Sequence, residues 1–509
     1  SLFNWFCLSR NMIIRFKCLL PYRGPHPLHR LFSAGVIPQS SAFAAVPTTV
    51  LLRSYTVLWL CSQRWLTSRA MKALKISERI AGPALTHMFL RNTLFKQFVA
   101  GESAADIGPT IDRLRQLNVG CILDYAVEDD LDSEPTHVEW DANMASFCAT
   151  VRAAQQHQSM IALKVTALGS PELLEHTSNI LAKVHSIYRS FNVSKNGEMT
   201  RAEFINGCER IGVDINKPGF NINTLFNRFD REKTNTINFL DWILYLTPEK
   251  LHTRSETVLP HLDEAQRAEL EKLVFRLETI IDDAAAADVH VLVDAEHTYF
   301  QNAIDHIVTN LQRKYNTGGR SIVSGTYQAY RRDTAERLKV DISRAQREGF
   351  RFSAKLVRGA YMTEERARAA AKGYPDPINP DVNSTTAQLT ECVQIFLRFS
   401  KNADLMFASH NADSIEYVTG KMAKHDIAPD RVKFAQLLGM ADHVTNTLSA
   451  SGYRTFKYVP FGPIGKVVPY LLRRAEENSV VNTGTTKERR LMLQELKSRF
   501  LAMFSNRKS

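Results

Sequence analysis

The chain has 509 residues, of which 44% are hydrophobic and 23% are charged, and its formal net charge is +11. A single barrel domain takes about 250 residues, so a chain of this length is expected to carry additional segments. The positive charge is confined to one end: residues 1–77 hold ten Lys and Arg and no acid, while the rest has 54 basic and 53 acidic residues. The folded part is therefore almost neutral, which excludes a broad basic surface for nucleic acid.

An acid-free segment that contains Arg and Ser opens the chain, and the first acidic residue is Glu78. This composition is typical of a mitochondrial transit peptide, so residues 1–70 are predicted to be a disordered leader. A basic arm for nucleic acid is the alternative, which is disfavoured because no basic cluster continues beyond it. The most apolar stretch, Tyr55–Cys61, is far shorter than the roughly 20 residues that span a bilayer.

The seven cysteines are widely scattered and form no Cys-x-x-Cys pair. Neither a disulfide framework nor a zinc site is therefore expected, which fits a reducing compartment such as the mitochondrial matrix. After the leader, residues 71–118 are predicted to be helical and to pack outside the next domain. Ser103 or Asp106 is the expected N-cap of a helix there.

Eight short and almost continuously apolar segments follow, as expected for strands that are buried on both faces. Helical periodicity separates most of them, for example at Glu364–Lys372 and Thr385–Lys401. Alternation of eight strands with helices predicts a (β/α)8 barrel of the α/β class, built from residues 119–183 and 253–509. The expected strands are Val119–Val127, Met160–Leu168, Val289–Glu296, Ile322–Ala329, Phe352–Tyr361, Leu405–Asn411, Val432–Leu438 and Tyr453–Val459.

A polar side chain stands at or just after the carboxyl end of each expected strand, which is the face where barrel enzymes keep their active sites. One Lys or His in such a place is more often structural. Eight polar strand ends on one rim favour a functional site. They are Asp124, Lys164, Asp294, Gln328, Arg358 with Tyr361, His410, Gln436 and Tyr458.

The interval of 130 positions from Lys164 to Asp294 is too long for one strand-to-strand connection. Within it, residues 184–252 contain two similar units, in which an apolar helix leads into a twelve-residue loop and a second helix. The loops run from Asn192 to Glu203 and from Asp230 to Asp241. Both units resemble EF-hands, so an all-α EF-hand-like insert is expected between the second and third strands.

Each loop departs from the calcium-binding pattern. The first begins with Asn192 in place of Asp, and the second has Asn235 where the sharp turn prefers Gly. Because calcium needs about six to eight oxygen ligands, at best weak binding is expected, and an EF-hand pair that has lost its metal is the alternative. The candidate ligands are Asn192, Ser194, Asn196, Glu198 and Glu203 in the first loop, and Asp230, Glu232, Thr234 and Asp241 in the second.

The last expected strand should break at Pro460 and Gly462, and a helix with a polar face should follow. Residues three and four apart on a helix are neighbours. Two guanidiniums held by a carboxylate suit the bidentate grip of a small carboxylate ligand. A solvated helix face with an ordinary ion pair is the alternative. The helix residues concerned are Tyr470, Arg473, Arg474 and Glu477.

Five motifs carry a family resemblance: Val293-Asp-Ala-Glu296, Lys355-Leu-Val-Arg-Gly-Ala-Tyr361, Ser409-His-Asn411, Gln436-Leu-Leu-Gly-Met440, and Tyr470-Leu-Leu-Arg-Arg474 with Glu477-Asn478. Together and in this order they resemble proline dehydrogenases, which are FAD-dependent barrel enzymes. The resemblance spans about Leu114 to Asn482, apart from the insert. No Gly-x-Gly-x-x-Gly unit is present, so a Rossmann-type dinucleotide site is not expected.

The resemblance implies oxidation of L-proline to Δ1-pyrroline-5-carboxylate, with hydride transfer to FAD and electron transfer to ubiquinone. It also implies a peripheral location on the matrix side of the inner mitochondrial membrane. Catalytic roles fall on Asp294, Lys355 and Lys164, with Asp294 expected to organise Lys164. The implied substrate-binding positions are Lys164, Tyr458, Tyr470, Arg473, Arg474 and Glu477. The implied flavin-binding positions are Ala295, Gln328, Lys355, Arg358, Gly359, Ala360, Ser409 and His410.

Three alternatives stay open at this point. The first is a hydroxyproline dehydrogenase. Tyr458 argues against it, because this side chain leaves little room for a hydroxyl group on C4 of the substrate ring. The second is an inactive, calcium-responsive barrel scaffold. The third is an aldolase-like Schiff-base enzyme that uses Lys164, for which a lone strand-end lysine is the only sign.

Overall fold

The computed structural model describes residues 43–44, 46–67, 69–126, 136–217, 219–251, 259–399, 401–480 and 482–505. The chain divides into two compact units. One unit contains Gly169–Phe275 and Glu296–Ile307, and the other contains the remaining described residues, including the whole barrel.

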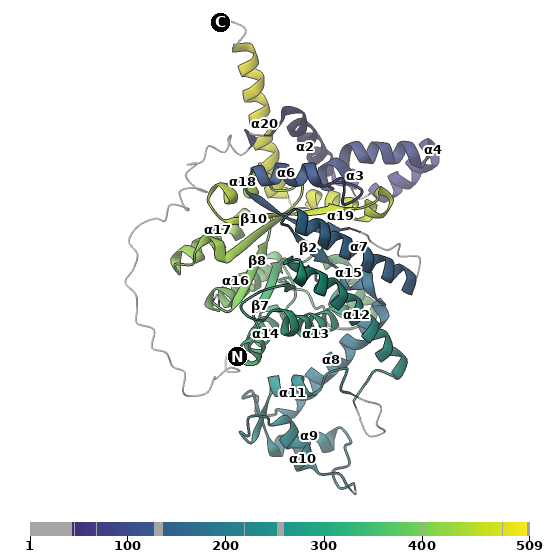
Figure 1. Ribbon diagram of the computed structural model, residues 1–509, viewed down its shortest axis with the longest axis vertical. Coiled ribbons are helices and arrows are strands. Elements are labelled where there is room, and N and C mark those ends of the chain that lie inside the picture. The colour runs from purple at the N-terminus through teal and green to yellow at the C-terminus, as the bar shows by residue number, and fades with distance from the viewer. Residues whose placement is uncertain are drawn as a thin grey trace. The chain divides into compact units, whose positions relative to one another are not determined.

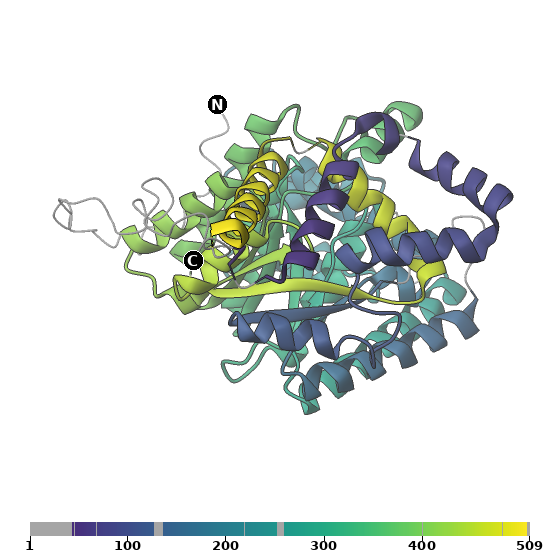
Figure 2. The same cartoon turned by 90° about the horizontal axis from the view of Figure 1, so that it is seen from above.

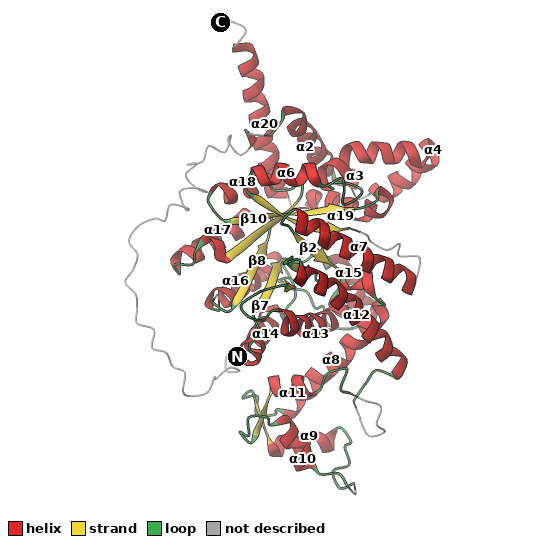
Figure 3. Cartoon of the chain, in the orientation of Figure 1, coloured by secondary structure: helices red, strands yellow, loops and turns green. Residues whose placement is uncertain are grey.

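Eight parallel strands form the predicted closed barrel, in the order β1-β10-β9-β8-β7-β6-β5-β2 (Figure 1). Helices surround these strands in the secondary-structure view (Figure 3). The strands are β1 (Val119–Tyr125), β2 (Met160–Leu163), β5 (Val291–Val293), β6 (Val323–Gln328), β7 (Phe352–Val357), β8 (Ala403–Ala408), β9 (Val432–Leu437) and β10 (Arg454–Phe461). The predicted fold class is therefore confirmed.

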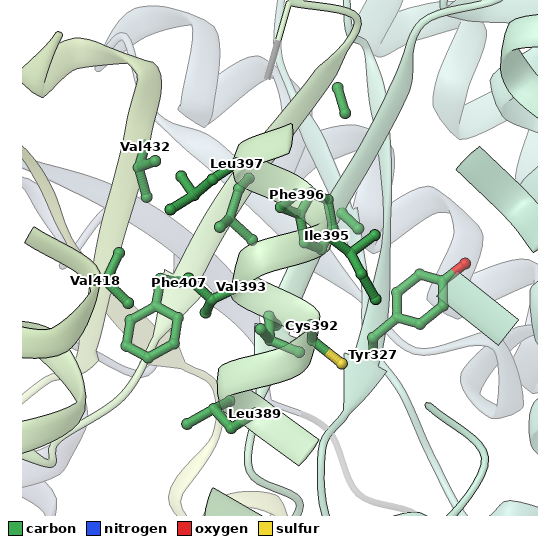
Figure 4. Packing of buried hydrophobic residues seen from close by; sticks show 14 of the residues in the cluster. Tyr327, Leu389, Cys392, Val393, Ile395, Phe396, Leu397, Phe407, Val418 and Val432 are labelled. Atoms are coloured by element: carbon green, nitrogen blue, oxygen red, sulfur yellow. The ribbon is translucent and has the colours of Figure 1, made fainter. Parts of the chain in front are cut away.

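Helices that follow the strands cover the barrel with apolar side chains. Helix α16 (Val382–Arg398) buries Leu389, Cys392 and Phe396 in a cluster that includes Phe407 of β8 (Figure 4). Fully burying such a side chain contributes about 1.5–3 kcal/mol. The other helices of this cover include α7 (His137–Gln156), α12 (Glu264–Ala286), α13 (Thr298–Tyr315), α14 (Thr334–Glu348), α15 (Met362–Lys372), α17 (Ala412–Lys424) and α18 (Asp442–Ala450).

The ends of several strands differ from the prediction. Strand β2 is followed by a 3₁₀ helix, Val165–Leu168, and β5 has only three residues. The expected break at Pro460 is wrong, because β10 continues to Phe461. Pairing of β10 with β9 ends at Tyr458, so Pro460 pairs with β1 alone. The missing N–H of the proline therefore removes no hydrogen bond between β10 and β9.

The prediction of a disordered leader as far as residue 70 is wrong for its last part. Helices α2 (Thr48–Cys61) and α3 (Arg64–Thr67) are folded, and α2 packs beside α20 (Asn482–Ser505) (Figure 2). Leu51, Leu58 and Cys61 recur at helical spacing and are buried there, a pattern that a count of charges overlooks. Residues 1–42 of the expected leader lie outside the described residues.

The segment 71–118 is largely helical, as predicted, and contains α4 (Ala70–Leu90), a π-helix (Arg91–Phe95), α5 (Lys96–Phe98) and α6 (Gly108–Gln116). The predicted N-caps are wrong. The carboxylate of Asp106 instead accepts hydrogen bonds from the backbone and hydroxyl of Ser103, and the N-cap of α6 is Ile107. No described helix is long and apolar enough to cross a membrane.

The unit that contains Gly169–Phe275 has two helix–loop–helix segments whose loops pair through a short antiparallel sheet. Its elements are α8 (Pro171–Phe191), β3 (Glu198–Thr200), α9 (Arg201–Arg210), α10 (Ile222–Phe229), β4 (Thr236–Asn238) and α11 (Phe239–Tyr245). Met199 and Ile237, at the eighth position of each loop, lie opposite each other. The predicted boundary at residue 184 is wrong, because it falls inside the continuous helix α8. The EF-hand assignment itself stays a prediction.

Candidate active site

Three residues from different strands meet at the carboxyl ends of the barrel strands. Lys355 lies on β7, Asp294 directly follows β5, and Tyr458 lies on β10. The ammonium group of Lys355 pairs with Oδ1 of Asp294, and the Tyr458 hydroxyl donates a hydrogen bond to Oδ2 at 2.7 Å. The Lys355 Nζ also lies 5.4 Å from the centroid of the Tyr458 ring. Both oxygens of Asp294 are thus committed to holding Lys355 and Tyr458 in place.

The cluster is buried, and its burial bears on the protonation of Tyr458. The side chains of Lys355 and Asp294 are only 7% and 14% exposed. Burial, together with the carboxylates of Asp124 and Asp294, raises the pKa of Tyr458 well above its usual range. Tyr458 is therefore a neutral donor at physiological pH. The partners found for Asp294 are Lys355 and Tyr458, whereas the sequence favoured Lys164, which directly follows β2.

A second cluster lies on α19 (Ile464–Val480), the helix after β10. Arg474 donates to Oε1 of Glu477 at 2.7 Å, and its guanidinium lies 4.9 Å from the centroid of the Tyr470 ring. The Arg473 guanidinium lies 5.9 Å from the ring of Tyr361. The predicted helical face is thus present. Among the described residues, the buried Nε of Arg474 and hydroxyl of Tyr470 have no hydrogen-bond partner. These atoms suit a polar ligand.

Arg358 follows the end of β7 and provides a half-buried positive charge. Its guanidinium donates to the hydroxyls of Thr386 and Ser414, at 3.2 and 3.0 Å. Among the residues that the structure describes, it bonds hydroxyls and no carboxylate. Burial lowers its pKa, although not enough to deprotonate a guanidinium. A cation in such surroundings can accept an anionic group without first breaking an ion pair.

Gly359 follows Arg358 and has a φ of +126°, which side chains other than hydrogen rarely allow. A Cβ at this position would also collide with the ring of Tyr330. The glycine therefore lets the backbone at this position pack directly against the ring of Tyr330. Gln328, at the end of β6, is buried and donates to the Tyr330 hydroxyl at 3.3 Å.

His410 follows β8 and is fixed in one tautomer. Its Nε2 accepts a hydrogen bond from the backbone N–H of Leu437 at 3.0 Å, so its proton is on Nδ1. Burial lowers the pKa of His410 to about 3, and the positive charges of Lys457 and Arg474 act in the same direction. His410 is therefore a neutral donor through Nδ1. Next to it, the Ser409 hydroxyl accepts from the backbone N–H of Asn411.

Sequence reasoning missed the residues that hold the loop after β9. Lys457, which is 1% exposed, donates to the carbonyls of Leu437 and Met440 and pairs with Asp442. From α20, the buried Glu488 accepts from the backbone N–H groups of residues 441 and 442. A lysine inside an apolar strand was the available signal, since a buried lysine needs partners.

Several candidate calcium ligands already accept hydrogen bonds, and Glu198 accepts one from Thr236 of the other loop at 2.8 Å. Glu203 accepts hydrogen bonds from the backbone N–H groups of Ser194 and Thr200, both at 2.8 Å. Asp230 accepts from the backbone of Thr234 and Asn235, at 2.8 and 2.9 Å. No group of three or more acidic, His or Cys residues suited to a metal is present in the described part of the chain. Asn192, Ser194 and Asn196 are linked to one another through the Ser194 hydroxyl.

Comparison with known proteins gives this arrangement a context. Residues 107–487 match the family described as proline dehydrogenase. Mitochondrial proline dehydrogenase 1 of Drosophila melanogaster is 30% identical over 91% of this chain and 80% of its own length. The human protein of that name is 31% identical, with 89% and 88% covered. Human hydroxyproline dehydrogenase is also 31% identical, with 90% and 92% covered.

The solved structures show the same fold. Proline utilization A from Bdellovibrio bacteriovorus, inactivated by N-propargylglycine, superposes with a TM-score of 0.55 at 18% identity. The match covers 88% of this chain but 39% of that one, so this chain spans about two fifths of the larger protein. The family match covers most of the chain and includes every strand of the barrel. This chain belongs to the proline dehydrogenase family.

Proposed function

We propose that this protein oxidises L-proline to Δ1-pyrroline-5-carboxylate. The observation that carries the proposal is the presence of two polar clusters, Lys355–Asp294–Tyr458 and Arg474–Glu477 with Arg473. They are linked because Tyr470, beside Arg474, lies near enough to affect the pKa of Tyr458. The first cluster offers an aromatic wall with fixed hydrogen bonds. The second offers guanidinium donors for a carboxylate. A small amino acid with an apolar ring needs both.

The residues present fit FAD as the cofactor. Arg358 is a half-buried cation with hydroxyl partners, as an anionic phosphate group requires, and the backbone of Gly359 after it packs directly on the ring of Tyr330. His410 Nδ1, Gln328 and Ser409 supply neutral polar groups, and Ala295 follows Asp294 at the same rim. When bound, FAD would accept the hydride that leaves the C5 carbon of the substrate ring. The protein's own part is to bind, orient and exclude water.

The substrate carboxylate is assigned to Arg473 and Arg474, with Lys164 as a third positive group. Glu477 holds the guanidinium of Arg474 through one nitrogen and leaves its buried Nε for a ligand oxygen. Charge-assisted bonds of this kind are shorter and stronger than neutral ones. With the carboxylate anchored on α19, the substrate ring is proposed to lie against Tyr458 and Tyr470.

Proline is favoured over 4-hydroxyproline, although the relatives include enzymes named for either substrate. The ring of Tyr458 is held from two sides, by the bond from its hydroxyl to Asp294 and by Lys355 at the ring face. It cannot swing away to admit an extra hydroxyl without breaking the bond to Asp294. A smaller residue at this position would leave the space that hydroxyproline needs.

We further propose that ubiquinone receives the electrons and that the protein works in mitochondria, peripherally on the matrix side of the inner membrane. Relatives named mitochondrial proline dehydrogenase support the mitochondrial part of this proposal. For the helical insert we propose an EF-hand-like structure with at most weak calcium binding, because Glu203 and Asp230 already accept backbone hydrogen bonds. Calorimetric titration that finds a submicromolar calcium site would contradict the latter proposal.

The test of the main proposal is anaerobic addition of L-proline to the flavin-containing protein. Bleaching of the visible absorbance of the oxidised flavin is expected, and reoxidation should follow on adding a quinone. Full flavin content without bleaching would contradict the proposal. If calcium then changed the thermal stability of that protein, an inactive calcium-responsive scaffold would be the better account.

A further inference from the structure

The N-terminal helices expose an unusual amount of apolar surface. Of the sixteen large hydrophobic side chains exposed in the described residues, eight lie between Leu52 and Phe89. They include Trp59, Trp65 and Ile80, which are 46%, 66% and 82% exposed. Soluble proteins rarely gather large exposed apolar residues in one short segment without a binding role. These residues do not belong to the active site described above.

Helix α4 turns back on itself at the centre of this segment (Figures 1 and 2). Gly82 has a φ of +82° and Pro83 follows it. Ser77 and Thr86 lie 2.9 Å apart through their hydroxyls, whereas nine residues of a straight helix would separate them by about 13 Å. Ile80 stands at the resulting corner.

The two arms of the corner carry further exposed apolar residues. Ile76 and Ile80 are one turn apart on the first arm, and Leu85 and Phe89 are one turn apart on the second. Their exposed fractions are 55%, 82%, 55% and 63%. The opposite side of the helix is covered, since Leu90 is buried and Leu74 packs against the core beside α2. The helix is thus amphipathic, and its apolar face is turned outward.

Charge indicates what this face meets. Residues 48–98 contain eight Lys and Arg and one acid, Glu78, which pairs with His87 at 3.5 Å. Lys72, Arg79 and Arg91 are exposed among the apolar residues. Exposed apolar side chains, tryptophans and basic residues in one helical segment are the combination that binds the interface of an anionic bilayer. A second protein chain with an apolar patch would not account for the cationic excess.

We propose that the bent helix α4 and the tryptophans of α2 and α3, here called the N-terminal apolar surface, dock this protein on an anionic lipid bilayer. The corner at Ile80 enters the headgroup region, and the exposed basic residues contact lipid phosphates. This inference deepens the peripheral membrane association proposed above by naming the surface. Since the described helices contain no membrane span, the surface lies on the bilayer.

Vesicle flotation tests the surface. The flavin-containing protein should float with vesicles of phosphatidylcholine and cardiolipin, bind phosphatidylcholine alone at least tenfold less, and lose binding as salt is raised. The double variant Ile80→Glu/Phe89→Glu should bind anionic vesicles at least tenfold less. The control is Val138→Glu/Val382→Glu, which alters residues 78% and 73% exposed on α7 and α16 and should bind normally.

Two outcomes would overturn the proposal. The first is equal flotation of the double variant and the unmodified protein at equal thermal stability. The second is that neither protein binds vesicles, while sedimentation shows a dimer for the unmodified protein and a monomer for the double variant. A second copy of the chain would then cover the N-terminal apolar surface. Proline oxidation with a soluble dye as acceptor should be unchanged in all variants. Failure of that assay in the unmodified protein would count against the proposed function and not against the surface.

Discussion

Tyr458 donates its hydroxyl hydrogen to Oδ2 of Asp294 at 2.7 Å, which joins two residues 164 positions apart. The other oxygen of Asp294 pairs with Lys355, and that ammonium group lies against the face of the same tyrosine ring. The three side chains therefore fix one another. Asp294 therefore holds both the aromatic ring of Tyr458, which shapes the site, and the positive charge of Lys355.

Changing Tyr458 should separate these two effects. The unmodified enzyme should prefer proline over trans-4-hydroxyproline by about 1–3 kcal/mol, the range for one misfitting group. Tyr458→Phe keeps the ring but loses the bond to Asp294 that holds it, so kcat/KM should fall and the preference should narrow only in part. Tyr458→Ser should narrow the preference, mainly by weakening proline. The measurement is kcat/KM for both substrates in each protein. An unchanged ratio of the two values in the serine variant would show that Tyr458 does not determine the choice between proline and hydroxyproline.

Arg474→Met should weaken proline binding and leave the flavin in place. The variant loses a charge-assisted bond worth about 1.5–3 kcal/mol, so the KM for proline should rise at least about tenfold. Glu477→Gln keeps the guanidinium but weakens its anchor, so a smaller rise is expected. Steady-state kinetics and the ratio of flavin to protein provide the measurements. Loss of flavin with unchanged proline affinity would show that Arg474 binds the flavin and not the substrate.

Arg358→Met should have the opposite effect, because Arg358 is assigned to the flavin. The purified variant is expected to hold less FAD, with a Kd raised about tenfold or more, as loss of one charge-assisted bond implies. Flavin fluorescence titration measures this change. Arg320→Met is the matched control, since Arg320 pairs with Asp288 at the surface, ahead of β6. Equal FAD affinity in both variants would remove Arg358 from the cofactor site.

The barrel could be predicted from the sequence because its eight strands are apolar runs with polar residues at their carboxyl ends. The partner of Asp294 could not be predicted in this way. Lys164 and Lys355 both belong to expected strands, and the sequence does not show which ammonium group reaches Asp294. The pairing of the strands in the closed barrel brings Lys355 to this carboxylate. The loop after β9 was also hidden, since Lys457 and Glu488 hold it from a neighbouring strand and a distant helix. The break expected at Pro460 was wrong because a proline costs a strand a hydrogen bond only where a neighbouring strand would accept it. The pairing of β10 with β9 has already ended at Tyr458.

The contacts that α20 makes with Phe43 and Val46 lead to a truncation test. Phe43 is 1% exposed, and Arg499 of α20 donates to the carbonyls of Phe43 and Val46, both at 2.8 Å. Removal of residues 1–40 leaves these contacts in place, so this truncation serves as the reference protein. Removal of residues 1–67 should lower the melting temperature, because α2 and its buried side chains are lost. Equal melting of both truncations would show that α2 does not stabilise the fold.

The last prediction concerns stability against acid. His290 lies just before β5, with Nδ1 2.7 Å from the carbonyl oxygen of Ser321 and Nε2 2.7 Å from the Ser324 hydroxyl. Burial and the nearby charge of Lys433 lower the pKa of His290 to about 3. In the unfolded chain this pKa is about 6.5, so between these values the unfolded state binds more protons than the folded state.

The contribution of His290 to stability is therefore complete above about pH 6.5 and is lost as the pH falls toward 3. One such group changes the free energy of unfolding by at most about 1.4 kcal/mol per pH unit. His290→Gln cannot take up the proton, so it should lose less stability between pH 7.5 and 5.5 than the unmodified protein. The comparison isolates His290 from His410, whose pKa is lowered in the same direction. Urea unfolding at both pH values measures the difference, and parallel losses in the two proteins would mean that His290 is not the group that titrates.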